Sequence, residues 1–474
     1  MLNKTRLINL CGAMLIGMSA AISTQVYANN EAMLDLLKIL RDKGSISNDE
    51  YQLLTSASKA DGEKVEGKLN EVTADVKEKT KNMAKITTEG KFKIESQDGQ
   101  HSFQPIGRIF WDAMNTDSDG SAAIFAGGTE LRRARLGFEA QYFKHWKSKL
   151  EYDFAGGSDV SLKDGWISYD NKFGLVDNSN FDIKVGQHHV PFGITTINSS
   201  KNMTFARRPL FADGPLQPAR QAGVAAKIHD DNYRWHLNAG VFYDEPDDGT
   251  TGGPGENRVT ASIRATGIPF MTDEKHMLQV GASYMYMDQN DTPFRVRQRA
   301  ITHKDTARMF DTGSIANGGV DSVDAFDLEA LVIYGPFYAL GEYVHWSVDG
   351  GTGPALGTDF DLSGWSIEGG WFITGESKKF KGAAMDGISP SRPFPGGPGA
   401  WEVAARFENL DLNDTDAGII GGDGDVFTVG MNWYPIKNVR FMLDYNKLTD
   451  FDRTGDPNDG TNPSSITMRS SVYW

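Results

Sequence analysis

Apolar and polar residues alternate with a period of two along most of the chain after residue 88. In 439–446, for example, valine, phenylalanine, leucine and tyrosine occupy the odd positions, and arginine, methionine, aspartate and asparagine the even ones. Successive side chains of a β-strand point to opposite faces of the sheet, so such a segment has one apolar and one polar face. Each alternating segment covers about 10 residues, the length of a tilted strand that spans a membrane.

Turn-rich segments separate these runs, and together they predict sixteen strands. An even number of strands is typical of an up-and-down barrel with both chain ends on the periplasmic side. The predicted strands are 101–113, 130–142, 146–155, 161–170, 180–188, 221–230, 233–243, 257–266, 276–287, 322–334, 336–348, 362–376, 400–411, 425–435, 438–449 and 464–474.

The polar face repeatedly carries charge, as with Arg133, Arg135 and Glu139. Sixteen strands enclose an interior too wide for wall side chains to fill, so the charged face should enclose water. The apolar face must then contact lipid. The sequence therefore predicts an all-β fold, a 16-stranded antiparallel transmembrane β-barrel over 89–474. The final strand ends on Trp474, a terminal aromatic residue that resembles the insertion signal of bacterial outer-membrane barrels.

Residues 29–88 differ from the barrel because their apolar residues follow a helical period. Residues 31–43 predict an amphipathic helix, and Asn48 is the expected cap of a second, short helix. Positions spaced by seven follow, which allows a short coiled coil with another copy of the chain, or a solvated amphipathic linker. We expect a helical or coiled-coil periplasmic arm. The two heptad sets are Leu69, Val76 and Met83, and Val65, Val72, Lys79 and Ile86.

The first 28 residues resemble an export leader. Lys4 and Arg6 precede an apolar stretch, and the segment 26–28 (VYA) fits a signal-peptidase site, so we expect cleavage after Ala28. The single cysteine, Cys11, lies in this leader. The chain has 63 acidic against 48 basic residues, which excludes a broadly basic nucleic-acid binder, and its lack of other cysteines excludes a thiol enzyme or cysteine-ligated metal centre. No cofactor or metal site is predicted.

Several segments are similar to the phosphate-selective porin O and P family. This resemblance implies a sixteen-stranded, trimeric channel of the bacterial outer membrane that in several members is anion-selective. The segments are 131–139 (LRRARLGFE), 150–155 (LEYDFA), 185–187 (VGQ), 190–193 (VPFG), 374–377 (TGES), 399–407 (GAWEVAARF) and 430–434 (GMNWY).

The segment 190–220 is too long for a hairpin turn, and we expect it to fold into the pore. It contains Lys201, Arg207, Arg208 and Arg220 against one acid, Asp213. Arginine presents a planar fork that suits carboxylate or phosphate. The pattern allows a guanidinium-lined anion site, or arginines paired with wall acids such as Asp164 or Asp182.

Further candidates lie on the wall and in a second long loop. Arg133 and Arg135 should face the lumen, and Arg132 should face outward at the membrane rim. The loop 288–320 either narrows the pore or lies exposed at the surface. Its basic residues are Arg295, Arg297, Arg299, Lys304 and Arg308.

Together these features predict a porin rather than an enzyme. It would pass small anionic solutes by diffusion, as a homotrimer in contact with outer-membrane lipid and lipopolysaccharide. The acid-rich loops 244–256, 411–425 and 450–459 are suited to hold the divalent cations that lie between lipopolysaccharide molecules. A structural or adhesive barrel and a barrel-embedded hydrolase are the alternatives; twelve strands with a Ser–His pair at the rim would favour the hydrolase.

Overall fold

The computed structural model describes residues 33–80, 83–88, 90–121, 125, 127–156, 160–174, 176, 178–212, 214, 216–243, 258–289, 294–305, 308–315, 319–351 and 358–474. The predicted leader, its cleavage site and the acid-rich segment 244–256 lie outside these residues. The chain forms two compact units, one with the helices and one with the barrel.

The helical unit contains a helix over residues 33–42 and the long helix α2, Asn48–Thr80. Ser47, rather than the predicted Asn48, caps α2. The Glu50 amide donates to Oγ of Ser47 (3.2 Å), and the Ser47 amide donates to the Glu50 carboxylate (2.8 Å), which is a capping box. Because α2 ends at Thr80, the last predicted heptad positions are not helical, and Ile86 lies in strand β1, Lys85–Thr87.

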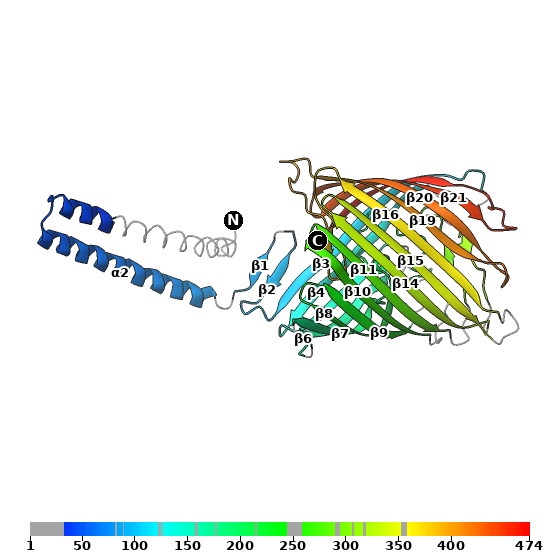
Figure 1. The fold of residues 1–474 in the computed structure, drawn as a ribbon, viewed down its shortest axis with the longest axis horizontal. Helices are drawn as coiled ribbons and strands as arrows, with labels where there is room; N and C mark the ends of the chain where they lie inside the picture. The colour runs from blue at the N-terminus through cyan, green and yellow to red at the C-terminus, as the bar shows by residue number, and fades with distance from the viewer. Residues whose placement is uncertain are drawn as a thin grey trace. The chain divides into compact units, whose positions relative to one another are not determined.

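Sixteen long strands form one antiparallel barrel in the described chain, and all sixteen predicted ranges overlap them (Figure 1). The short strands β1 and β2 (Lys93–Glu95) precede it. The barrel strands are β3 Ser102–Asp117, β4 Gly128–Tyr142, β5 Trp146–Asp153, β6 Ser161–Lys172, β7 Ser179–His189, β8 Arg220–Asp230, β9 Trp235–Tyr243, β10 Val259–Asp273, β11 His276–Asp288, β14 Val320–Tyr334, β15 Phe337–Gly350, β16 Phe360–Phe372, β19 Ala400–Asp414, β20 Ile419–Ile436, β21 Val439–Asp452 and β22 Ser464–Tyr473.

The barrel closes between its last and first long strands. β22 pairs with β3 in a continuous antiparallel register that runs from Ser464 opposite Asp117 to Tyr473 opposite Arg108. The predicted sixteen-stranded closed barrel is therefore confirmed. No helix in the described part of the chain is both long and apolar enough to cross a membrane.

The two faces of the strands differ in polarity as predicted. On β22, Ile466 and Met468 lie on the outer face and are 49% and 57% exposed. Their neighbours Thr467 and Arg469 point inward and are buried. Across the barrel, fully buried side chains include Arg264 and other arginines of the wall. The apolar outer face and charged inner face are those of a membrane barrel.

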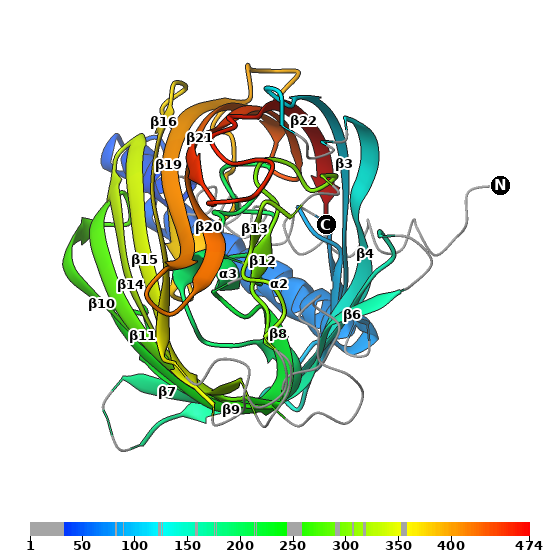
Figure 2. The same cartoon turned by 90° about the vertical axis from the view of Figure 1, so that its right-hand side faces the viewer.

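Inward-folded segments occupy part of the interior. Figure 2 shows α3 (Ile194–Ile197), β12 (Arg297–Gln298) and β13 (Phe310–Asp311) inside the ring of strands. Residues of the two long loops pack with wall residues into a buried apolar cluster. The cluster includes Phe192, Leu210, Phe211, Phe294, Met309, Phe310, Leu410 and Phe451.

A third inward segment, 373–399, was predicted only as the end of a strand and a turn. It carries the short strands β17, Lys379–Lys381, and β18, Ala384–Asp386. The Lys378 ammonium group donates to Oγ1 of Thr204 (3.2 Å), and Asn202 donates to the Met385 carbonyl (2.9 Å). This segment therefore supports the loop 190–219 inside the barrel.

Candidate functional site

The segment 190–219, between β7 and β8, folds into the barrel as predicted. Phe192, Ile194 and Phe211 are fully buried and fix it there. Gly193 has a φ of 67°, and a Cβ atom at this position would lie 2.2 Å from Nε2 of Gln217. Glycine is therefore required where the loop turns close to its own returning strand.

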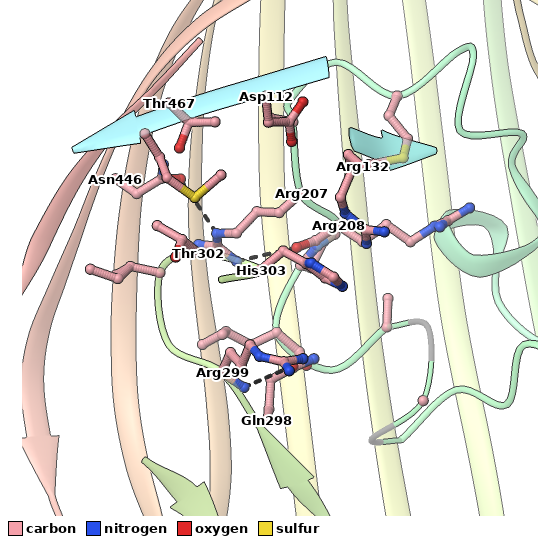
Figure 3. Close-up of a pocket in the computed structure, with 18 of the residues that line it drawn as sticks. Asp112, Arg132, Arg207, Arg208, Gln298, Arg299, Thr302, His303, Asn446 and Thr467 are labelled. Carbon is pink, nitrogen blue, oxygen red and sulfur yellow. Dashed lines mark hydrogen bonds between the residues drawn. The ribbon is translucent and has the colours of Figure 1, made fainter. Parts of the chain in front are cut away.

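Arg207 and Arg208 lie side by side at the inner end of this loop (Figure 3). The Arg207 guanidinium forms an ion pair with Glu408 on β19. Arg208 donates from Nε to the Thr195 carbonyl (3.0 Å) and from its terminal nitrogen to the Asn198 carbonyl (2.6 Å). The two guanidinium groups are thus held in place by different acceptors, one a carboxylate and the other backbone carbonyls.

Arg220 and Lys201 occupy separate positions of the same segment. Arg220, the first residue of β8, pairs with Asp164 on β6 at 3.3 Å, which is one of the wall pairings the sequence left open. The Lys201 ammonium lies 5.7 Å from the ring centre of Tyr473. Burial, followed by the charge of Arg108, lowers the pKa of Lys201 to about 8.

Arg133 and Arg135 point inward from β4, as predicted, and are buried. Arg135 donates from Nε to Asp153 at 2.8 Å. The expectation that Arg132 faces outward is wrong. The pairing of β3 with β4 shifts between Phe110 and Trp111 and leaves Arg132 as an extra residue, a β-bulge that allows two successive side chains to reach the interior.

The second long loop also enters the barrel. Arg299 donates from Nε to the Asp305 carbonyl (2.7 Å), and Arg295 pairs with Asp311. Burial lowers the pKa of Arg299, and burial together with neighbouring arginines lowers that of Arg308 to about 10. Both remain cationic near neutral pH. The sequence allowed this loop either to narrow the pore or to lie exposed at the surface. The structure has the first arrangement.

These elements surround a cavity of about 270 Å³ (Figure 3). Among the residues that the structure describes, its lining includes nine arginines and one acid, Asp112, which is itself paired with Arg469 on β22 at 2.6 Å. The nine are Arg132, Arg133, Arg207, Arg208, Arg295, Arg297, Arg299, Arg308 and Arg469. Four stretches of chain distant in sequence thus supply positive charge to one space.

A second cavity of about 780 Å³ adjoins the first, because Arg132, Arg133 and His303 line both. Its lining also includes Arg135 and Arg220. His303 accepts or donates a bond to Glu130 at 3.0 Å, and burial lowers the pKa of this histidine. Five of the six sequence-predicted site residues line these adjoining cavities: Arg133, Arg207 and Arg208 in the first, and Arg135 and Arg220 with Arg133 in the second. Lys201 lies outside the lining of both.

Two of the nine lining arginines escaped sequence reasoning. Arg469 could have been found, because its position in the alternation of β22 places it opposite Ile466 and Met468. Arg132 carries no such signal, since the bulge that turns it inward depends on the pairing of β3 with β4.

Comparison with known proteins gives matches over most of the barrel. The family model described as phosphate-selective porin O and P matches residues 103–474. An uncharacterized protein of Caulobacter vibrioides is 28% identical over 361 residues, 74% of this chain and 69% of that protein. Porin O of Pseudomonas aeruginosa is 25% identical over 421 residues, 82% of this chain and 92% of that protein.

Among solved structures, a loop L8 deletion mutant of OmpT, an outer membrane protein of Vibrio cholerae, aligns with a TM-score of 0.49 and 13% identity, covering 79% of this chain and 100% of that chain. The family match extends from the second residue of β3 to the end of β22 and includes every strand of the barrel. The chain therefore belongs to the phosphate-selective porin O and P family.

Proposed function

We propose that this outer-membrane porin passes small anions by diffusion through a lumen that its two inward loops narrow. The observation that carries the proposal is the lining of the inner cavity, which contains nine arginines and one aspartate in the described part of the chain. The whole chain has a net charge of −15, so this concentration of positive charge is local. A pore selects ions by the field and width of its constriction, and this field favours anions.

The site residues contribute to the field in two ways. Arg207, Arg220 and Arg135 pair with wall carboxylates, so each adds little net charge to the lumen and mainly fixes the arrangement. Arg208 and Arg299 line the inner cavity, where bonds to backbone carbonyls hold them, and their guanidinium groups contribute to its positive field. We assign direct contact with the passing anion to this second group and to Arg133.

The chemistry of the lining fits oxyanions. A guanidinium group offers parallel N–H donors that match the oxygens of carboxylate or phosphate. Several such groups around one small cavity can replace the hydration of an anion as it passes. The relative named Porin O and the family description support a phosphate-type or organic anion as the solute.

The oligomeric and cellular context is part of the same proposal. The apolar seam of α2 is unpartnered within the described chain, with Val65 and Val72 42% and 52% exposed. Three copies in a coiled coil would cover this seam, so we propose a homotrimer whose arm lies in the periplasm. We also propose that the leader is cleaved after Ala28. Chemical cross-linking of the purified protein tests the homotrimer, and its mass spectrum tests the cleavage site.

Recordings from the purified protein in a planar lipid bilayer test the proposed function. We expect ohmic currents that appear in steps of three channels. In a salt gradient, the sign of the reversal potential should indicate higher permeability for anions than for cations. Added phosphate or small organic anions should block the chloride current. Absence of current from an intact barrel would support a structural or adhesive barrel instead. A reversal potential on the cation side would contradict the assigned role of the arginines.

A further inference from the structure

Three buried carboxylates gather on two adjacent strands, away from the arginine-lined cavities. Asp327 and Glu329 lie on β14 and Glu342 on β15, where Glu342 is the register partner of Glu329. One oxygen of each lies within 4.8 Å of the others. Arg264 of β10 donates two hydrogen bonds to Glu329, at 2.9 and 2.6 Å, and is the one cation in ion-pair contact with the group among the described residues.

The other contacts of the cluster come from neutral groups of the inward loop. The Thr195 amide donates to both oxygens of Glu342, at 3.2 and 3.3 Å. Nε2 of Gln217 donates to Asp327 at 2.7 Å and to Glu342 at 2.9 Å. Three carboxylates and one arginine leave two negative charges without a counter-charge, and buried charges of this kind are strongly destabilising unless they are neutralised.

A second observation at the same place is a buried amide with an unsatisfied oxygen. Gln279 of β11 is 0% exposed, and its Nε2 donates to Glu329 at 2.7 Å, so its amide belongs to the cluster. Its Oε1 accepts no hydrogen bond from any residue that the structure describes, and neither does Oδ1 of the fully buried Asp327. Buried oxygens without a donor are uncommon in folded proteins. Such oxygens are available as ligands for a cation.

We propose that Asp327, Glu329, Glu342 and Gln279 bind one calcium-type divalent cation that fixes the inward loop to the barrel wall. Calcium takes six to eight oxygen ligands at about 2.3–2.6 Å in flexible geometry, so its ligands stand up to about 5 Å apart. Magnesium requires a near-ideal octahedron and usually keeps several waters, which a buried set of protein oxygens does not offer. The cation neutralises the excess charge and holds Glu342 where Thr195 of the loop binds it.

This proposal goes beyond the proposed function and does not depend on the transported solute. None of the four residues lines either arginine-rich cavity. If no calcium binds here, the proposal of anion conduction still stands. If the pore proves to be cation-selective, the proposal of a calcium site still stands.

Calcium binding to the folded protein tests the proposal directly. The detergent-solubilised barrel is treated with EDTA, and bound Ca²⁺ is then counted by equilibrium dialysis for the wild type, Asp327→Asn and Glu342→Gln. Glu368→Gln is the matched control, because Glu368 is also a buried wall carboxylate and accepts a bond from Thr204 of the same loop (3.1 Å). We expect one calcium fewer per chain in the first two variants and the wild-type number in the control.

An equal number of bound ions in the wild type and Asp327→Asn would overturn the proposal. It would mean that protonation of the carboxyl groups neutralises the excess charge. A measurement on the wild type covers the case in which a variant fails to fold. Crystals soaked in Tb³⁺ should show an anomalous peak between the three carboxylates. Absence of that peak, with terbium bound elsewhere on the molecule, would also overturn the proposal.

Discussion

Removing two of the arginines that face the cavity should weaken anion selectivity by an amount that follows from the geometry. The change we choose is the double variant Arg208→Gln with Arg299→Gln. Both side chains line the 270 Å³ cavity, and both donate to backbone carbonyls. Glutamine keeps a donor at each position and removes the charge, so the loops should keep their packing.

The expected magnitude comes from the size of the cavity. A sphere of this volume has a radius of about 4 Å, which places each guanidinium about 5.5 Å from an anion at its centre and gives about 0.75 kcal/mol per charge in water-like dielectric. Two charges therefore contribute about 1.5 kcal/mol, or roughly tenfold in anion occupancy at low salt. Screening at 0.1 M salt, where the Debye length is about 10 Å, reduces this to roughly fourfold.

The assay is the reversal potential of the reconstituted channel in a KCl gradient, measured at two ionic strengths. We expect the ratio of anion to cation permeability to fall, and to fall more at low salt. Lys172→Gln is the control, because Lys172 is exposed and pairs with Asp231 at a turn. A reversal potential equal to that of the wild type at both ionic strengths would refute the assigned role of the two arginines.

Three further outcomes follow from the structure. Arg220→Gln should shift the reversal potential less than Arg208→Gln, because Arg220 lies outside the lining of the inner cavity and pairs with Asp164; an equal shift would contradict this difference. The pKa of Lys201 is about 8, so its ammonium is charged at pH 7 and mostly neutral at pH 9. Anion selectivity should therefore fall over this range in the wild type and stay constant in Lys201→Arg. Ser47→Ala removes the cap of α2 and should cost about 1 kcal/mol of helix stability, seen as a lower melting temperature of the helical circular dichroism signal.

The alternation of apolar and polar residues was sufficient to predict the barrel, because each strand is covered by lipid on one side and by polar surroundings on the other. The same alternation places Arg133 and Arg135 in the lumen, and it would have placed Arg469 there. It fails at Arg132, where a bulge shifts the register. A bulge is a property of two paired strands and leaves no mark in the spacing of one.

The inward loops show a second limit of sequence reasoning. The basic composition of 190–220 indicated a role in the pore, but the contacts that hold it there join residues far apart in the chain. Phe211 packs against wall residues such as Val344 and Leu410 in one buried cluster. The acid cluster around Asp327 was missed for the same reason, since it forms only when β10, β11, β14, β15 and the loop meet.

The central claim is that the apolar face of the strands contacts lipid while the polar face encloses a solvent-filled lumen. Single cysteines at Thr467 and Met468 test it most directly, in a Cys11→Ser background that has no other cysteine. These neighbours on β22 face opposite ways, and Thr467 lines the arginine cavity. In liposomes, a water-soluble anionic thiol reagent should label Thr467→Cys and spare Met468→Cys. Labelling of Met468→Cys with protection of Thr467→Cys would contradict the account.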